Sequence, residues 1–302
     1  MHRVIPLFFA LLFFFVADIS AAIDATEATP KVPKPEITVK YGQTYVERES
    51  GPLKADVYMP ATPGPHPGVI VVHGGAWYMG TRAQLTGIAQ RLAREGFTAV
   101  AISYRFAPKH KFPAQIEDCK AAVRWMREQA ETWKIDPNRI GGFGYSAGAQ
   151  LVTLLGTSDA ADGLEDPAAD NSVSTRLQAV AGGGTPSDFR LIPLDNSWLA
   201  FWLGGTRRDQ PEQYRRASPV VYASEDDPPM FLFHGENDQL VPLDSAQHLV
   251  DSLTNVGVPA EIYVAPKLGH NVTVFDRESL NKSLAFLKKE LRPGALPAQA
   301  TP

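Results

Sequence analysis

Residues 139–157 read RIGGFGYSAGAQLVTLLGT, and this stretch decides the fold class. After Arg139 its first half is small or apolar and has the length of a buried strand. The residues from Ala147 to Thr157 predict a helix. Between the two halves, Gly144-Tyr145-Ser146-Ala147-Gly148 fits the pattern G-x-S-x-G, with a glycine two residues before and two residues after the serine. The stretch therefore predicts a strand that turns sharply into a helix, with Ser146 at the turn.

Strand and helix patterns alternate on both sides of this stretch. Alternating apolar residues predict a β-hairpin with strands at 37–46 and 53–59, and short runs predict six more strands, at 68–72, 97–104, 139–145, 178–183, 230–234 and 260–265. Apolar residues at helical spacing predict helices within 85–92, 116–126, 147–157, 243–255 and 275–291. This alternation predicts an α/β protein with an eight-stranded, mostly parallel sheet and helices on both faces.

Residues 185–229 break the alternation. They contain three large aromatic residues, Trp198, Phe201 and Trp202, and end in the polar, proline-rich run EDDPP. We expect them to form a small cap-like insertion over the sheet edge where ligands usually bind.

The first residues have the pattern of a secretory signal. His2 and Arg3 precede an apolar run at residues 4–16, and Ser20 and Ala22 fit the small positions before a cleavage site. The run is short for a membrane span, which needs about 20 residues. We therefore expect a secreted or periplasmic protein without a stable membrane anchor after cleavage.

These patterns predict one folded domain. The expected organisation is a signal peptide at 1–22, a flexible lead-in at 23–36, an α/β domain at 37–291 and a disordered tail at 292–302.

The composition excludes several classes of partner and site. The chain has 302 residues and a formal net charge of -4, which disfavours a nucleic-acid partner. Its single cysteine, Cys119, excludes an intrachain disulfide and a zinc site built on thiolates. No oligomeric state follows from these residues.

A serine hydroxyl is a weak nucleophile unless a base accepts its proton, and the chain has seven histidines as candidates. His270 follows Gly269 after the last predicted strand, at the same sheet edge as Ser146. The other six lie in the signal, in loops, on a predicted helix or at strand ends: His2, His66, His73, His110, His234 and His248. His270 is therefore the candidate base.

The base needs an acid that orients its ring. Asp238 follows the predicted strand at 230–234 and lies at the ligand-binding edge, and Glu236 in the same loop is its competitor. Asp226 and Asp227 precede that strand, and Asp244 fits an N-cap. Ser146, Asp238 and His270 are thus the candidate catalytic residues.

The loop His73-Gly74-Gly75-Ala76-Trp77 follows the third predicted strand. Glycines let the backbone present N–H groups toward a developing negative charge. The candidate oxyanion hole is therefore Gly74-Gly75-Ala76, with the N–H of Gly75 or Ala76 and that of Ala147 as donors.

Together these residues resemble the α/β-hydrolase superfamily over about residues 37–291, including its chain order of serine, acid and histidine. The loop at 73–77 and the motif at 144–148 resemble the hormone-sensitive-lipase-like carboxylesterases. More narrowly they resemble the bacterial feruloyl/acetyl esterase-like (BD-FAE) group and its arylformamidase cousins. Lipase-type members usually carry a third glycine where this chain has Ala76, which favours the BD-FAE and arylformamidase side.

The resemblance implies a serine carboxylesterase that works through an acyl-enzyme, without a metal or cofactor. The expected substrates are short-acyl or aromatic-acyl esters, on small molecules or oligosaccharides as in acetyl or feruloyl esterases. Candidate substrate contacts are Trp77, Tyr145, Trp198 and Trp202. The alternatives are an arylformamidase-like enzyme, a general lipase or carboxylesterase, and a catalytically silent binding protein on the same fold.

Overall fold

The computed structural model describes residues 35–170 and 172–292. The predicted signal peptide, most of the lead-in and the tail beyond residue 292 lie outside the described residues. Among the described residues, no helix combines the length and apolar character that crossing a membrane requires.

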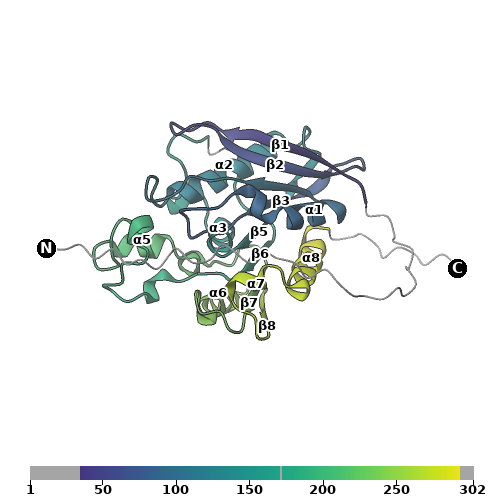
Figure 1. The fold of residues 1–302 in the computed structure, drawn as a ribbon. Helices are drawn as coiled ribbons and strands as arrows, with labels where there is room; N and C mark the ends of the chain where they lie inside the picture. The colour runs from purple at the N-terminus through teal and green to yellow at the C-terminus, as the bar shows by residue number, and fades with distance from the viewer. Residues whose placement is uncertain (1–34, 171, 293–302) are drawn as a thin grey trace, which may run out of the picture. The chain divides into compact units, whose positions relative to one another are not determined.

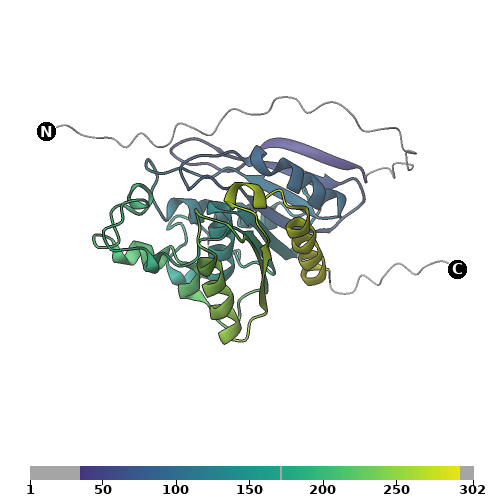
Figure 2. The same ribbon diagram turned by 60° about the horizontal axis from the view of Figure 1, so that its bottom comes forward.

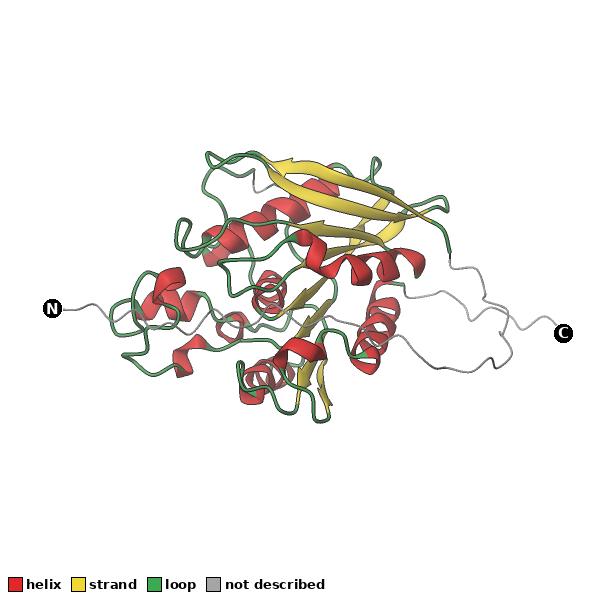
Figure 3. Ribbon diagram, in the orientation of Figure 1, coloured by secondary structure: helices red, strands yellow, loops and turns green. Residues whose placement is uncertain are grey.

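Eight strands form one sheet in the order β1-β2-β4-β3-β5-β6-β7-β8 (Figures 1 and 3). They are β1 Ile37–Val46, β2 Leu53–Pro60, β3 His66–Val72, β4 Thr98–Ile102, β5 Ile135–Tyr145, β6 Val180–Gly183, β7 Met230–Gly235 and β8 Ala260–Ala265. Strand β2 pairs antiparallel with β1 and β4, and all other neighbours are parallel. The predicted eight-stranded, mostly parallel sheet is confirmed.

Helices cover both faces of this sheet (Figures 1 and 2). The longer ones are α1 Thr86–Arg94, α2 Ala114–Glu128, α3 Ala147–Thr157, α6 Leu243–Asn255 and α8 Arg277–Leu291. Alternate residues of β3 pack into the two apolar cores on opposite faces of the sheet. Ile70 and Val72 share one apolar core with α2, α3 and α6, whereas Val69 and Val71 share the other with α1 and α8. Strands buried on both faces in this way read as continuous apolar runs, which is why β3 was recognisable in the sequence.

Some element boundaries differ from the prediction. Strand β5 begins at Ile135, before the predicted start, and its pairing with β3 shifts register between Pro67 and Gly68. Helix α8 begins at Arg277 because the side chain of Asp276 accepts the N–H of Ser279 at 2.8 Å. A short helix, α7 His270–Thr273, stands where a loop was expected.

The segment between β6 and β7 forms short helical pieces joined by loops. They are η3 Phe189–Leu191, α4 Ala200–Leu203, α5 Pro211–Arg216 and η4 Pro219–Tyr222. The side-chain amide of Gln150 on α3 donates to the carbonyl of Ala217 at 2.9 Å. The segment is thereby attached to the helix that follows Ser146.

The order of the strands places two loops side by side. From β3 the chain proceeds to β4 on one side, and from β5 it proceeds to β6 on the other. Loops that leave neighbouring strands in opposite directions mark the point where open α/β sheets bind ligands. Here these are the loop that begins at His73 and the turn at Ser146.

Candidate active site

Ser146 occupies the strained turn between β5 and α3. Its backbone has φ +56° and ψ −123°, a conformation that residues other than glycine rarely adopt. A Cβ added at Gly144 would lie 2.2 Å from the carbonyl oxygen of Gly148, and one added at Gly148 would lie 2.0 Å from that of Val72. The two glycines of the motif are therefore required by backbone contact.

The imidazole of His270, the first residue of α7, lies between Ser146 and Asp238. Its Nε2 is 2.9 Å from Ser146 Oγ, and its Nδ1 is 2.6 Å from Asp238 Oδ2. An ionised carboxylate can only accept a hydrogen bond, so Nδ1 carries the hydrogen and Nε2 is the acceptor for the serine hydroxyl. This is the tautomer that a general base toward Ser146 requires.

Asp238 is held by its own turn. Its Oδ1 accepts the N–H groups of Leu240 at 3.0 Å and Val241 at 2.9 Å, and its side chain is fully buried. Burial alone would raise the pKa of this carboxyl, but hydrogen bonds from His234 and His270 outweigh it and lower the pKa well below its usual range. Asp238 therefore stays ionised beside His270.

Glu236, the sequence-based competitor of Asp238, points elsewhere. Its carboxylate accepts the backbone N–H of Lys267 at 2.7 Å on the exposed side of the loop. The structure therefore brings Asp238 to His270 and assigns Glu236 a contact with the loop after β8.

The candidate oxyanion loop lies against Ser146. A Cβ added at Gly74 would be 3.2 Å from Ser146 Cβ. The next three residues have positive φ angles, +118° at Gly75, +49° at Ala76 and +61° at Trp77. Non-glycine residues with such angles cost about 1–3 kcal/mol each and persist only where the surroundings impose them.

The side chain of Trp77 shows what imposes this conformation. Its Nε1 donates to Gln150 Oε1 at 2.8 Å, and its indole stacks on that of Trp202 with ring centroids 3.7 Å apart. Gln150 lies one helical turn after Ser146 and bonds to Ala217 in the insertion. The loop from β3, helix α3 and the insertion are thus joined through Trp77.

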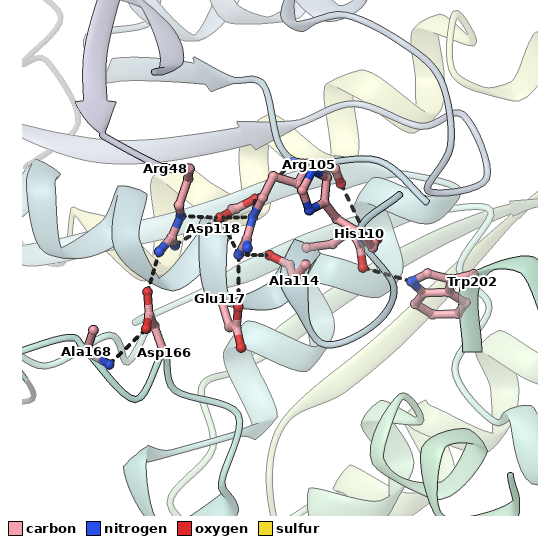
Figure 4. A network of polar contacts seen from close by, with 10 residues as sticks. Arg48, Arg105, His110, Ala114, Glu117, Asp118, Asp166, Ala168 and Trp202 are labelled. Atoms are coloured by element: carbon pink, nitrogen blue, oxygen red, sulfur yellow. Dashed lines mark hydrogen bonds and ion pairs between the residues drawn. The ribbon is translucent and has the colours of Figure 1, made fainter. Parts of the chain in front are cut away.

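Trp202 is in turn attached to α2. Its Nε1 donates to Gln115 Oε1 at 2.9 Å, and the amide of Gln115 donates to the carbonyl of His110 at 2.7 Å. In the same network, Arg105 donates to Glu117 and to the fully buried Asp118 (Figure 4). This polar network joins the loop between β4 and α2 to the insertion through Trp202.

The four predicted aromatic contacts have different surroundings. Trp202 has no exposed surface, so the prediction that it contacts substrate is wrong; its place is in the core beside Trp77. Trp77 is 4% exposed and acts as a support of its loop. Tyr145 is also buried, and its hydroxyl donates to the backbone oxygen of His270. Trp198 is 75% exposed on the insertion and stays a candidate contact.

The sequence analysis did not name Gly184 as a site residue, and it set His234 aside as a histidine at a strand end. Gly184 has φ +56°, and an added Cβ would lie 2.9 Å from His270 Cε1. His234 lies 3.2 Å from Asp238 Oδ2 through its Nε2. The run of three glycines at 182–184, at the end of the predicted strand 178–183, was the available signal for Gly184.

Comparison with known proteins shows the family of this chain. The BD-FAE family model matches residues 55–253. The chain belongs to the BD-FAE family. The match includes β3 to β7, the loop at 73–77, Ser146 and Asp238, and ends within α6 before His270.

Curated relatives of this BD-FAE chain include esterase LipC of Mycobacterium tuberculosis, 32% identical over 72% of this chain and 55% of the relative. Another is the probable carboxylic ester hydrolase LipM of the same organism, 33% identical over 66% of this chain and 48% of the relative. The chain spans about half the length of these relatives.

Among solved structures, a truncated carbohydrate esterase from gut microbiota has a TM-score of 0.78 and 25% identity, over 86% of this chain and 98% of that chain. A bifunctional GH43-CE protein of Bacteroides eggerthii has a TM-score of 0.77 and 27% identity, over 87% of this chain and 36% of that chain. The BD-FAE chain therefore has the α/β-hydrolase fold.

Proposed function

We propose that this BD-FAE family member is a serine carboxylic ester hydrolase whose catalytic triad is Ser146, His270 and Asp238. The observation that carries the proposal is the continuous hydrogen-bonded path from Ser146 Oγ through both ring nitrogens of His270 to Asp238 Oδ2, at 2.9 and 2.6 Å. The relatives named esterase and carboxylic ester hydrolase support the same reaction class.

In the proposed mechanism, His270 Nε2 accepts the proton of Ser146 as Oγ attacks the ester carbonyl. Backbone N–H groups of Gly75 or Ala76, with that of Ala147, donate to the oxygen that becomes negative. The imidazolium then protonates the leaving alcohol. A water molecule, activated by the same base, releases the acid from the acyl-enzyme. Asp238 orients His270 and stabilises its charged form throughout.

The proposed substrates are short-acyl or aromatic-acyl esters of carbohydrates, of the acetyl or feruloyl type. The neighbouring structures described as carbohydrate esterases support this class. The exposed indole of Trp198 offers a flat apolar surface on the insertion. The signal-like segment at residues 1–22 favours a secreted or periplasmic enzyme, which would meet a polymer fragment rather than the intracellular N-formylkynurenine of an arylformamidase.

The reaction class is tested with Ser146→Ala and the matched control Ser172→Ala, which removes an exposed serine. We expect turnover of a nitrophenyl acetate and labelling by a fluorophosphonate in the wild type and Ser172→Ala, and loss of both in Ser146→Ala. Labelling that persists in Ser146→Ala would show a different nucleophile. A folded wild-type protein that takes no label and turns over no ester would be a catalytically silent binding protein.

The substrate class is tested by comparing kcat/KM for acetylated and feruloylated xylan fragments with that for N-formylkynurenine and for a long-chain nitrophenyl ester. We expect the highest values for the xylan fragments. A preference for formylkynurenine or for the long-chain ester would replace the carbohydrate proposal by the arylformamidase or the lipase alternative.

A further inference from the structure

The carboxylate of Asp238 has a second imidazole beside it. His234 lies near the end of β7, and its side chain is fully buried. Its Nε2 is 3.2 Å from Asp238 Oδ2, the same oxygen that His270 Nδ1 contacts at 2.6 Å. One carboxylate oxygen therefore lies between two histidines.

The surroundings of His234 determine which nitrogen carries its hydrogen. Nε2 is also 2.9 Å from the carbonyl oxygen of Val241, and a carbonyl can only accept. Nε2 is therefore the donor, shared between Val241 and Asp238. Nδ1 is buried and has no hydrogen-bond partner among the described residues.

His234 also ties the turn that carries Asp238 to the sheet. Val241 accepts from His234 through its carbonyl and donates to Asp238 Oδ1 through its N–H at 2.9 Å. The next residue of β7 is Gly235, where an added Cβ would lie 2.5 Å from the carbonyl oxygen of Leu268, just before His270. The end of β7 thus contacts both the Asp238 turn and the segment that leads to His270.

We propose that His234 is a positioning residue that holds Asp238 and limits how strongly this carboxylate stabilises protonated His270. A carboxylate that accepts an additional N–H has less charge available for its other partner. His234 would thereby keep His270 in the unprotonated, active form at lower pH than Asp238 alone would allow. The inference rests on the ester hydrolysis proposed above.

The other titratable groups around this cluster are accounted for. Tyr145 on β5 faces Asp238, and burial is the main cause that raises the pKa of its hydroxyl, so it is neutral at working pH. Glu236 in the same turn bonds to the backbone of Lys267 in the loop after β8. Among the described side chains that contact the Asp238 carboxylate, His234 and His270 are the titratable ones.

The decisive comparison is between His234→Phe, which removes the N–H donor and keeps a ring, and His234→Gln, whose amide can place an N–H near the position of Nε2. In His234→Phe we expect kcat to fall about 10-fold or more with little change in KM, because orientation of the base is lost. We expect the acid limb of its kcat/KM profile to move to higher pH by about half a unit or more. His234→Gln is expected to restore both toward the wild type.

Thr98→Val is the matched structural control, because Thr98 is also fully buried and its hydroxyl donates to the carbonyl of Trp133 at 3.1 Å, at the opposite end of the sheet. It is expected to lower thermal stability without moving the acid limb. An acid limb that stays in place in a folded His234→Phe would overturn the proposal. If that variant does not fold, His234→Asn, whose amide is too short to reach Asp238, takes its place.

A second readout does not depend on ester turnover. The Nδ1 proton of His270 should give a downfield proton resonance that moves further downfield in His234→Phe and returns in His234→Gln. A shifted resonance in a protein that hydrolyses no ester would support the positioning role and reject the proposed function. Ester hydrolysis with neither the resonance nor the acid limb displaced would reject the positioning role alone.

Discussion

The indole rings of Trp77 and Trp202 stack face to face, with centroids 3.7 Å apart and planes 3° apart. Trp77 belongs to the candidate oxyanion loop and Trp202 to the insertion, so this pair joins two segments that are distant in the sequence. Gln150, one turn after Ser146, closes the contact by accepting from Trp77 Nε1 at 2.8 Å. The strained backbone from Gly75 to Trp77 is thus supported by the helix that begins beside Ser146.

A first prediction concerns this support. Trp77→Phe keeps an aromatic ring on Trp202 but leaves Gln150 Oε1 buried without its donor, which costs about 1–3 kcal/mol. We expect kcat to fall about 10-fold because the N–H groups of the oxyanion loop are less well placed. Steady-state kinetics and thermal unfolding measure the two effects. Trp125→Phe on α2 is the control, expected to lower stability with kcat retained; an unchanged kcat in Trp77→Phe would show that the loop does not need this support.

A second prediction concerns Gly184. Gly184→Ala places a Cβ 2.9 Å from His270 Cε1 and forces a non-glycine residue to φ +56°. We expect activity to drop about 100-fold, since a small displacement of the base is enough to disrupt proton transfer. Gly163→Ala is the control, because Gly163 has φ +69° and nothing within 4 Å of an added Cβ. The positive φ should destabilise Gly163→Ala about as much as it destabilises Gly184→Ala, but Gly163→Ala should keep its activity.

A third prediction concerns stability in acid. Burial of His73 lowers the pKa of its imidazole to about 4. The unfolded chain binds this proton more readily than the folded protein does. The contribution of neutral His73 to the free energy of unfolding is therefore complete above about pH 6.5 and is lost as the pH falls toward 4. The loss is on the order of 3 kcal/mol in total.

The test follows the free energy of unfolding from pH 7 to 4. We expect its decline to be less steep in His73→Phe than in the wild type. His248→Phe controls for the loss of an imidazole from the partly exposed face of α6. Equal slopes in His73→Phe and the wild type would show that His73 does not contribute to acid unfolding.

A fourth prediction concerns substrate selection by Trp198. The side chain is 75% exposed, so Trp198→Ala should leave thermal stability unchanged within about 0.5 kcal/mol. We expect KM for feruloylated xylan fragments to rise about 5-fold or more through lost stacking, with little change for nitrophenyl acetate. Tyr41→Ala removes a 63% exposed ring from β1 as a control. Equal KM values in both variants would exclude Trp198 from substrate binding.

A fifth prediction concerns the pH dependence of turnover. Protonation of His270 removes the acceptor for the hydroxyl of Ser146, so kcat/KM should fall as the medium becomes acidic. Asp238 remains charged over the same range, because its hydrogen-bond donors hold the pKa of its carboxyl well below the usual range. A single ionisation should therefore describe the acid limb. Two ionisations in this limb would indicate that Asp238 titrates as well.

Most of the fold could be predicted from the sequence because its signals are local. Strands β3, β4 and β7 are buried on both faces, so they appear as continuous apolar runs, and the helices between the strands show a regular apolar spacing. Helix α7 was missed because four residues are too few to show a periodic pattern. The element boundaries at Ile135 and Arg277 depended on a register shift and a cap.

The candidate site divides in the same way. By itself the sequence determined the sharp turn at Ser146, because a side chain at position 144 or 148 would collide with the backbone and both positions therefore need glycine. It also placed Asp238 and His270 at the same sheet edge. Only the tertiary structure decided that Asp238 rather than Glu236 reaches His270, that Trp202 belongs to the core, and that His234 shares the carboxylate. These outcomes depend on side-chain distances of about 3 Å between segments far apart in the chain, and residue spacing carries no information about such distances.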